Sequence, residues 1–369
     1  MDRDAYLVEG ADDLVSPALV YYRDIIVANT KRIVEMAGGA DRLWPHVKTH
    51  KTAELIRMQM EMGISRFKCA TVAEAEMTAV EGAAHIILAY PLVGPNINRY
   101  LRLAKDFPGT VFYAIGDNFD QLAILAEALC RSGSRMNVLI DVDIGMHRTG
   151  ASLDSLEALY GRCAALDGLV MKGLHCYDGH RHEHELDARK SAAYDGDKKV
   201  LEIQGALRQK GLECEILVMG GSPSFPCRTG NSGFFLSPGT IFVGDWGYYS
   251  NYPDLAFTPG AALFCRVVSH PSGRSFTLDL GSKGIATDPA GDRGVIAGLP
   301  EARPLFQSEE HWVFSLPEGK DLPPIGSVQY VIPTHVCPTS ALYSEVVAVS
   351  GGKIDGRWAV KARNRQINY

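Results

Sequence analysis

Short apolar and β-branched runs recur along the first two thirds of the chain, with amphipathic stretches between them. The stretches at 52–63 and 118–133 carry apolar residues at i, i+3 and i+4, the spacing of a helix with one buried face. Alternation of strands and helices predicts a parallel sheet with crossover helices. About eight such units over roughly 230 residues favour a closed (β/α)8 barrel over an open doubly wound sheet. The predicted strands lie near residues 43–50, 65–71, 84–90, 109–115, 135–143, 168–177, 214–221 and 239–247.

The pattern changes after about residue 250. Short alternating segments such as SFTLDLG and SEVVAVSGG are broken by Gly, Pro, Asp and Ser, and no helical period is evident there. This predicts an all-β domain. We therefore expect an α/β barrel domain over 17–249 and a β domain over 250–369, which residues 1–16 join.

Composition excludes several classes of protein. The 369 residues are 46% hydrophobic and 22% charged with a net charge of -6, and no basic tract indicates nucleic acid as a partner. No apolar run approaches the ~18 residues of a membrane span, and the acidic N-terminus does not resemble a signal peptide. A cytoplasmic protein is expected. The eight cysteines contain no C-x-x-C pair and are expected to be core residues rather than disulfides.

The segment PHVKTHK at 45–51 raises the question of an inward-facing lysine. If it is a strand, Trp44, His46, Lys48 and His50 share one face and point into the barrel. A buried lysine is costly unless the protein uses it. One use is a Schiff base with an aldehyde cofactor, because burial frees the amine as a nucleophile. The alternative is a lysine at the barrel mouth that reaches solvent.

Polar side chains follow the strand predicted at 135–143. The segment DVDIGMHRTG offers a carboxylate at Asp143, a turn glycine at Gly145 and a guanidinium at Arg148. Arg148 is suited to hold a phenolate or a carboxylate by paired hydrogen bonds. The alternative is an ordinary polar loop. The histidine-rich stretch at 174–185 suggests a metal, but its spacing on a loop favours a solvated segment.

Six motifs, in their order and spacing, resemble one family. They are PHVKTHK, ATVAEAEM, GMHRTG, YDGH, GGSPSF and HVCPT. They resemble the fold-type III pyridoxal-phosphate (PLP) enzymes and, among these, the D-threonine aldolase / D-serine dehydratase family, which shares its barrel with alanine racemase. The resemblance runs from about residue 17 to the C-terminus. It implies a PLP-binding (β/α)8 barrel, a C-terminal β domain and, in most members, a homodimer.

The resemblance also assigns residues to the cofactor and the substrate. It implies PLP on Lys48, with His180 close enough to touch the substrate. Glycines after the seventh strand and before the eighth suit a phosphate site, because they let the backbone approach phosphate oxygens; a plain turn is the alternative. The expected cofactor-binding set is Lys48, His46, Arg148, Tyr177, Gly221, Ser222, Gly239 and Thr240. Ser237 stands where alanine racemase has an arginine facing the ring nitrogen, which weakens a racemase interpretation.

A pair of metal-ligand residues lies in PTHVCPT at 333–339. On an extended segment His335 and Cys337 leave the same face. Imidazole and thiolate suit Zn²⁺ and leave positions for water or a substrate hydroxyl. The alternative is a core cysteine beside a turn histidine. In the resembled family this position is the metal site of the lyases. The thiolate favours Zn²⁺ over Mn²⁺ or Mg²⁺.

These features together predict a lyase that uses PLP and a divalent metal on a D-configured β-hydroxy amino acid. Members with Cys at the second metal position are dehydratases, so Cys337 favours a D-serine-dehydratase-type elimination to a 2-oxo acid and ammonia. The alternative is D-threonine-aldolase-type cleavage to glycine and an aldehyde. An amino-acid racemase and a non-catalytic PLP-binding protein are further alternatives. The expected partner is a small D-amino acid, with neither nucleic acid nor a membrane.

Overall fold

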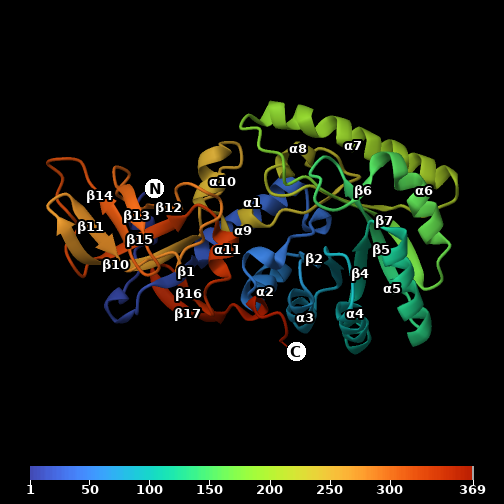
Figure 1. Cartoon of the computed structure of the whole chain (residues 1–369), viewed down its shortest axis with the longest axis horizontal. Coiled ribbons are helices and arrows are strands. Elements are labelled where there is room, and N and C mark those ends of the chain that lie inside the picture. Colours follow the sequence, from blue (N-terminus) through green and yellow to red (C-terminus); the bar gives the residue numbers. More distant parts are fainter. Residues whose placement is uncertain (368–369) are drawn as a thin grey trace. The chain divides into compact units, whose positions relative to one another are not determined.

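The computed structural model describes residues 1–367, which divide into two compact units (Figure 1). The barrel unit contains residues 32–48, 55–239 and 364–367. The β unit contains residues 1–31, 49–54 and 240–363. Each unit is therefore assembled from segments that are distant in the sequence.

The barrel unit is built on a parallel sheet in which each strand pairs with the next along the chain. Isolated bridges pair Leu43 with Leu236 and His46 with Lys68, so residues 43–46 join the two edge strands. The strands are β2 (Arg66–Cys69), β3 (His85–Leu88), β4 (Val111–Gly116), β5 (Met136–Asp143), β7 (Leu169–Tyr177), β8 (Ile216–Met219) and β9 (Phe235–Leu236), with β6 (Ala151–Ser152) beside β5.

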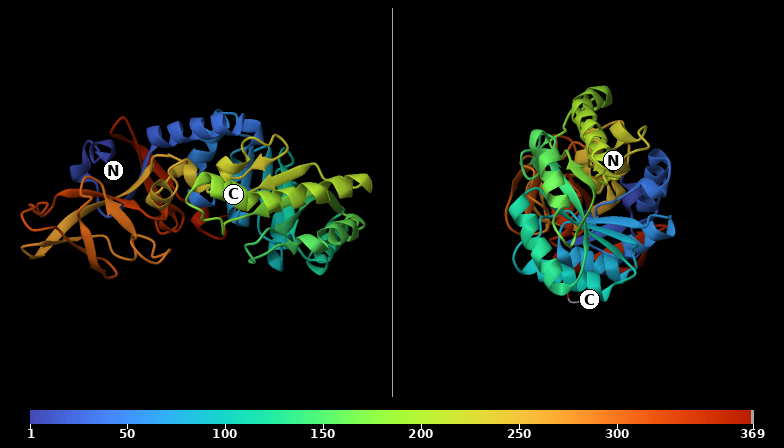
Figure 2. Two further views of the ribbon diagram at one scale, coloured as in Figure 1. Left: turned by 90° about the horizontal axis from the view of Figure 1, so that it is seen from above. Right: turned by 90° about the vertical axis from the view of Figure 1, so that its right-hand side faces the viewer.

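Helices connect these strands, and in the right-hand view of Figure 2 the teal and green helices lie outside the sheet. Side chains cap two of them, because Thr71 accepts the N–H of Glu74 before α3, and Asn118 accepts two N–H groups before α5. The helices are α1 (Arg23–Ala37), α2 (Ala53–Glu61), α3 (Val72–Val80), α4 (Pro95–Asp106), α5 (Phe119–Ser132), α6 (Leu153–Ala164), α7 (Leu186–Gln209) and α8 (Phe225–Arg228), with short turns η3 (Ala40–Arg42) and η4 (Val47–Thr49).

Trp44 is at the centre of the core that the strands enclose. It is wholly buried, its indole N–H donates to the carbonyl of Phe67, and its ring packs edge-on against Tyr113 and Phe235. Full burial of a large apolar side chain stabilises a fold by about 1.5–3 kcal/mol. The other members of this core are Ile87, Tyr113, Ile115, Leu139 and Val218.

The β unit contains a mixed sheet in which β1 pairs antiparallel with β10 and parallel with β16. The sheet order is β13-β14-β11-β10-β1-β16-β17, and β15 pairs with both β10 and β12. Its strands are β1 (Ala18–Tyr22), β10 (Ala261–Ser272), β11 (Ser275–Leu278), β12 (Gly294–Ile296), β13 (Arg303–Gln307), β14 (Trp312–Ser315), β15 (Val328–Pro333), β16 (Glu345–Ser350) and β17 (Lys353–Ala359). Short helices are α9 (Thr240–Val243), α10 (Trp246–Asn251), α11 (Val336–Ser340), η1 (Asp4–Tyr6), η2 (Ala11–Asp13) and η5 (Lys361–Arg363).

The predicted fold class, an α/β barrel sheet followed by a β-rich region, is confirmed, but two predicted strands are wrong. Residues 47–49 form the turn η4, so the expected strand over 43–50 ends at the His46 bridge. Residues 240–243 form α9, and the last strand is instead β9. A short apolar run such as TIFV fits a buried helical turn as well as a strand, and its periodicity cannot distinguish them. Among the described helices, none has the length and apolar character that crossing a membrane requires.

His50, expected on one face with Lys48, lies in the β unit and is 2% exposed. Its Nδ1 accepts the backbone N–H of Thr52 at 3.2 Å. Burial and, to a smaller extent, the charge of Lys51 lower the pKa of His50 to about 3. His50 is therefore neutral at pH 7.

Replacement of His50 by Asn should make the free energy of unfolding less dependent on pH below about pH 6.5. Below pH 6.5 His50 is protonated in the unfolded chain, whereas in the folded chain it stays neutral down to about pH 3. The free energy of unfolding should therefore fall as the pH is lowered through this window, by up to about 4 kcal/mol. In His50→Asn the amide oxygen still accepts the Thr52 N–H but does not titrate. Denaturant unfolding at several pH values checks this, and parallel profiles for both proteins would contradict it.

Gly173 lies in β7 where this strand runs closest to β8. A Cβ at Gly173 would lie 1.8 Å from the backbone oxygen of Ile216. Gly173→Ala should therefore lower the free energy of unfolding by roughly 3 kcal/mol or more. Gly205→Ala is the matched control, because a Cβ at Gly205 in α7 meets nothing within 4 Å. It should stabilise the protein by about 0.5–1 kcal/mol. Chemical denaturation gives both values, and changes of the same sign would refute the assignment.

Candidate active site

The register of the parallel strands brings four polar side chains to one place. Strand β5 runs beside β7 with Asp141 opposite His175 and Asp143 opposite Tyr177. Alternate residues of a strand point to the same face, so each pair shares a face of its strand. All four lie at the carboxyl ends of their strands, where barrel enzymes carry their chemistry.

Three cationic groups surround the ring of Tyr177. The Nζ atoms of Lys48 and Lys68 lie 5.7 and 5.6 Å from the ring centroid, and the Arg148 guanidinium lies 5.0 Å from it. These distances are within the range of cation–π attraction. Together they make a positively charged surface around one aromatic ring.

Two glycines make room for this ring. A Cβ at Gly179 would lie 2.4 Å from the Tyr177 hydroxyl oxygen, and one at Gly221 would lie 2.8 Å from a ring carbon. Neither position accepts a side chain without moving Tyr177. The sequence assigned Gly221 to the phosphate of a cofactor, and the structure also gives it this packing role.

A hydrogen-bonded chain runs behind Lys68, which is 2% exposed. The Lys68 Nζ lies 3.5 Å from Nε2 of His175, whose Nδ1 lies 2.7 Å from Oδ1 of Asp141. The Thr149 hydroxyl donates to the other carboxylate oxygen of Asp141 at 2.8 Å. Burial and, after it, the charge of Lys48 lower the pKa of Lys68 to about 7.

The protonation of this chain follows from its contacts. Burial lowers the pKa of His175 although its hydrogen bond to Asp141 opposes this, so the imidazole is neutral at pH 7. Burial acts to raise the pKa of Asp141, but the hydrogen bonds from His175 and Thr149 outweigh it and the pKa is lowered. Asp141 is therefore a carboxylate that accepts the Nδ1–H of His175, which leaves Nε2 as an acceptor for Lys68.

Lys48 reaches Tyr177 from a turn rather than from a strand. It lies in η4, and its backbone N–H approaches Nδ1 of His46 at 3.4 Å. The backbone N–H of His46 donates to the carbonyl of Pro238 at 2.9 Å. The alternation argument that selected Lys48 is therefore wrong in its premise, although Lys48 does lie beside Tyr177.

The loop after β5 is held by Asp143. Its carboxylate accepts the backbone N–H groups of Gly145 and His147 at 2.9 and 3.0 Å, and the His147 imidazole lies 2.7 Å away. These contacts shape the loop that carries Arg148, so Asp143 has a local structural role.

His180 packs against this same loop, where a Cβ at Gly145 would lie 2.9 Å from its Nε2. Its Nδ1 is buried without a hydrogen-bond partner among residues 1–367. Burial and the charge of Arg181 lower the pKa of His180. A neutral imidazole with an unused nitrogen is suited to contact a ligand.

The predicted phosphate residues are only partly assembled. The backbone N–H of Gly239 donates to the Ser222 hydroxyl at 3.1 Å, and that of Gly221 donates to Ser224 at 3.2 Å. The Thr240 hydroxyl instead lies 3.3 Å from the sulfur of Cys337 in the β unit. Gly221, Ser222 and Gly239 therefore come together, while Thr240 contacts a different side chain.

A buried ion-pair network fixes the segment that follows Tyr177. Arg228, which is 2% exposed, donates to Asp178 at 2.7 Å and to both carboxylate oxygens of Asp197. Asp178 also accepts the Ser224 hydroxyl at 2.7 Å. Loss of one partner would leave a buried charge uncompensated, which costs about 3–5 kcal/mol. The network ties the end of β7 to the loop after β8.

In the β unit, His335 and Cys337 lie at the start of α11, not on an extended segment as expected. His335 precedes this helix and Cys337 is its second residue. Cys337 is nevertheless close enough to His335 to raise the pKa of its imidazole. His335 itself is extended, but Cys337 is helical, so the two do not share one extended segment, and the metal pair stays a prediction.

Hydroxyl and carboxylate groups surround this pair. Thr49 and Thr240 each place a hydroxyl oxygen 3.3 Å from the Cys337 sulfur, and Asp288 lies 3.4 Å from Nδ1 of His335. Burial acts to lower the pKa of His335, but Cys337 and nearby acidic groups raise it to about 9. Among residues 1–367, no three His, Cys, Asp or Glu side chains come together as metal ligands. A metal held by His335 and Cys337 would therefore complete its coordination with water or substrate.

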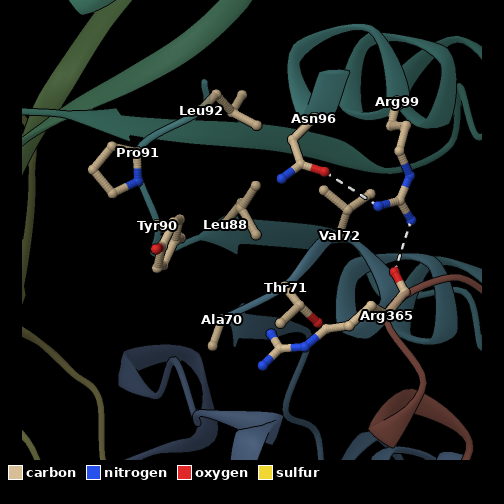
Figure 3. Close-up of a pocket in the computed structure, with 10 residues that line it drawn as sticks. All are labelled: Ala70, Thr71, Val72, Leu88, Tyr90, Pro91, Leu92, Asn96, Arg99 and Arg365. Atoms are coloured by element: carbon tan, nitrogen blue, oxygen red, sulfur yellow. Dashed lines mark hydrogen bonds between the residues drawn. The ribbon is translucent and has the colours of Figure 1, made fainter. Parts of the chain in front are cut away.

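A cavity of about 400 Å³ elsewhere in the barrel unit contains none of the predicted residues (Figure 3). The loops after β2 and β3 line it together with Arg99 and Arg365. Arg99 donates to Asn96 at 3.2 Å and to the carbonyl of Arg365 at 3.1 Å, so its charge is already engaged (Figure 3). The cationic surface around Tyr177 is the better candidate.

Sequence reasoning missed Lys68, Asp141 and the role of His175. His175 was grouped with a solvated histidine loop, but it lies in β7 and is buried, while His182 and His184 are exposed. The signal for Lys68 was available, because a lysine in the apolar run RFKCA raises the same question as Lys48.

Comparisons with known proteins agree with this architecture. The family model described as alanine racemase, N-terminal domain, matches residues 23–245, and that described as putative serine dehydratase domain matches residues 260–349. The D-threonine aldolase of an Arthrobacter species is 28% identical over 361 residues, covering 94% of this chain and 92% of that protein. The D-threo-3-hydroxyaspartate dehydratase of a Delftia species is 23% identical over 361 residues, covering 91% and 94%. The crystal structure of D-threonine aldolase from Filomicrobium marinum has a TM-score of 0.86 at 28% identity, covering 95% and 96%.

Proposed function

The chain belongs to the alanine racemase N-terminal domain family, and on this premise we propose that it is a PLP- and divalent-metal-dependent lyase. Its proposed substrate is a D-configured β-hydroxy amino acid, as for the named relatives. The observation that carries the proposal is the placement of Lys48, an amine, among the other cations around Tyr177.

The residues around Tyr177 fit an anionic aromatic aldehyde. When bound, PLP supplies an aldehyde that an amine can attack and a ring that withdraws electron density from the substrate α-carbon. Lys48 would hold the aldehyde, and Arg148 would donate to an anionic oxygen. Gly221, Ser222 and Gly239 would face the phosphate, while His46 and Tyr177 would border the ring. We also propose that Thr240 contacts the phosphate, as the sequence predicts, in addition to its contact with Cys337.

Two of these residues are suited to move or hold protons. The Lys48 Nζ, once it is free, is the candidate base for the α-proton of the substrate. The partnerless Nδ1 of His180 is a candidate contact for a polar group of the substrate.

His335 and Cys337 would hold the divalent metal. Imidazole and thiolate are a donor set that favours Zn²⁺, with Mn²⁺ or Mg²⁺ less suited. A metal at this position would polarise the β-hydroxyl as a Lewis acid. Thr49, which contacts the Cys337 sulfur, directly follows Lys48 in the chain.

For the reaction we propose β-elimination to a 2-oxo acid and ammonia, because Cys337 supplies the thiolate ligand of the dehydratases. Aldol cleavage to glycine and an aldehyde is the second candidate. It is favoured by the 28% identity to D-threonine aldolases, against 23% to the dehydratase. If His335 and Cys337 bind no metal, a racemase reaction would be favoured instead. The homodimer and the cytoplasmic location stay predictions.

Borohydride reduction of the PLP-loaded protein should fix the cofactor on Lys48. Reduction makes the bond between the amine and the cofactor permanent, so peptide mapping by mass spectrometry locates it. Lys48→Ala should carry no label, and Lys51→Ala, the neighbouring lysine, should keep it. A label on any other lysine would end the assignment of Lys48.

A product assay should separate the candidate reactions. D-serine, D-threonine and D-threo-3-hydroxyaspartate are incubated with the PLP-loaded enzyme and Zn²⁺ or Mn²⁺. We expect a 2-oxo acid and ammonia, the products of the dehydratase reaction. Glycine would indicate the aldolase reaction instead. The absence of both would favour the racemase.

The metal's role is read in the same assay. Cys337→Ala should lower bound metal and turnover by more than about tenfold, while the borohydride label stays on Lys48. Cys130→Ala is the control, because Cys130 is exposed. Unchanged turnover of Cys337→Ala would remove the metal from the reaction.

A further inference from the structure

Lys68 is a charged side chain buried in an apolar strand. It lies in β2 between Phe67 and Cys69, which are wholly buried, and is itself 2% exposed. Burial of an amine in such surroundings is costly unless its charge and its N–H groups are compensated. The proposed mechanism has assigned Lys68 no task.

The Lys68 amine has more N–H donors than it has acceptors in the described residues. His175 donates its Nδ1–H to Asp141, so its Nε2 accepts a single N–H of Lys68. An ammonium has three N–H donors. Within residues 1–367, His175 is the one hydrogen-bond acceptor of the Lys68 amine. At least one buried donor is therefore unused, and an unused buried donor points to an acceptor that a ligand supplies.

The charge around Lys68 indicates which acceptor this is. Lys48, Lys68 and Arg148 all lie within 6 Å of the centroid of one ring. Asp141 offsets one of these charges through His175. Asp178 is engaged by Arg228, and Asp143 by the backbone and the imidazole of its own loop. Positive charge is left in excess on the side that faces Tyr177. Like charges at this separation repel, so an anionic group would stabilise the cluster.

We propose that Lys68 is a further ligand-binding residue of this site, donating its unused N–H to an anionic oxygen of the bound ligand. His175 and Asp141 are the positioning residues that hold it. The inference rests on the proposed function, which supplies two sources of such an oxygen. One is the phenolate of PLP, which is next to the aldehyde on the ring. The other is the carboxylate of the amino-acid substrate.

Lys68→Met tests the proposal in the full-length protein, since Met keeps the length and apolar stem of the side chain without its donors. The matched control is Lys172→Met. Lys172 is a lysine of β7 whose amine is paired with Glu213 rather than buried. Titration of the apoprotein with PLP gives the dissociation constant of the cofactor. Spectral titration of the loaded protein with D-alanine and with isopropylamine gives binding of an amine with and without a carboxylate, and neither compound has a hydroxyl to eliminate.

The two sources give different results. If the phenolate is the acceptor, Lys68→Met weakens PLP binding by about tenfold or more, the loss of one charge-assisted hydrogen bond. If the carboxylate is the acceptor, PLP binding is unchanged, D-alanine binds about tenfold more weakly, and isopropylamine binding does not change. Lys172→Met should match the wild type throughout. Values for Lys68→Met that stay within about twofold of the wild type in all titrations overturn the proposal.

A second variant keeps the test decisive if Lys68→Met does not fold. Asp141→Asn preserves the size of the side chain and an acceptor for Thr149, but removes the charge that holds His175. It should weaken the same titration in the same direction, and an unchanged set of constants would overturn the proposal. Failure of the proposed function is read separately, because borohydride then leaves no label on Lys48 of the wild-type protein. A wild-type label on Lys68 would overturn both.

Discussion

Strands β5 and β7 run parallel with Asp141 beside His175 and Asp143 beside Tyr177, and the candidate site depends on this register. Side chains alternate along a strand, so a shift by one residue would turn all four to the opposite face. Gly173 is part of the same constraint, because the backbone of β8 at Ile216 lies where its Cβ would be. Arg228 then fixes Asp178, the residue after Tyr177, against the next strand. The strand register therefore places the polar side chains of β5 and β7 next to one another in the candidate site.

The positive charges gathered around Tyr177 lower the stability of the fold, because like charges repel and burial of a charge is unfavourable. Lys68 is buried, and Lys48 and Arg148 share its aromatic neighbour. The barrel unit offsets part of this cost through the carboxylate of Asp141, which acts on Lys68 across a neutral histidine. A fold that needed only stability would be better served by apolar residues at such positions. Charge retained here therefore indicates binding of an anion rather than packing.

The sequence was sufficient for the architecture and for part of the site. Periodicity located most of the barrel strands, because each is a buried run bounded by turn residues. It failed at residues 47–49 and 240–243, because a short apolar run fits a buried helical turn as well as a strand. Motif resemblance selected Lys48, Arg148 and Tyr177, which the structure brings together. The chain of Lys68, His175 and Asp141 was not visible, because it joins residues up to 107 positions apart through strand pairing.

The two lysines beside Tyr177 differ in the backbone that carries them, and this difference suits different tasks. Lys48 lies in a turn, and its side chain is partly exposed. Lys68 lies in a strand between paired neighbours, with His175 and Asp141 behind it. An amine that must be released and then accept a proton benefits from a backbone that permits movement. An amine that must present a fixed N–H to an anion benefits from a locked rotamer and a rigid strand. Lys68, and not the Lys48 that alternation selected, is therefore the buried lysine of the pair.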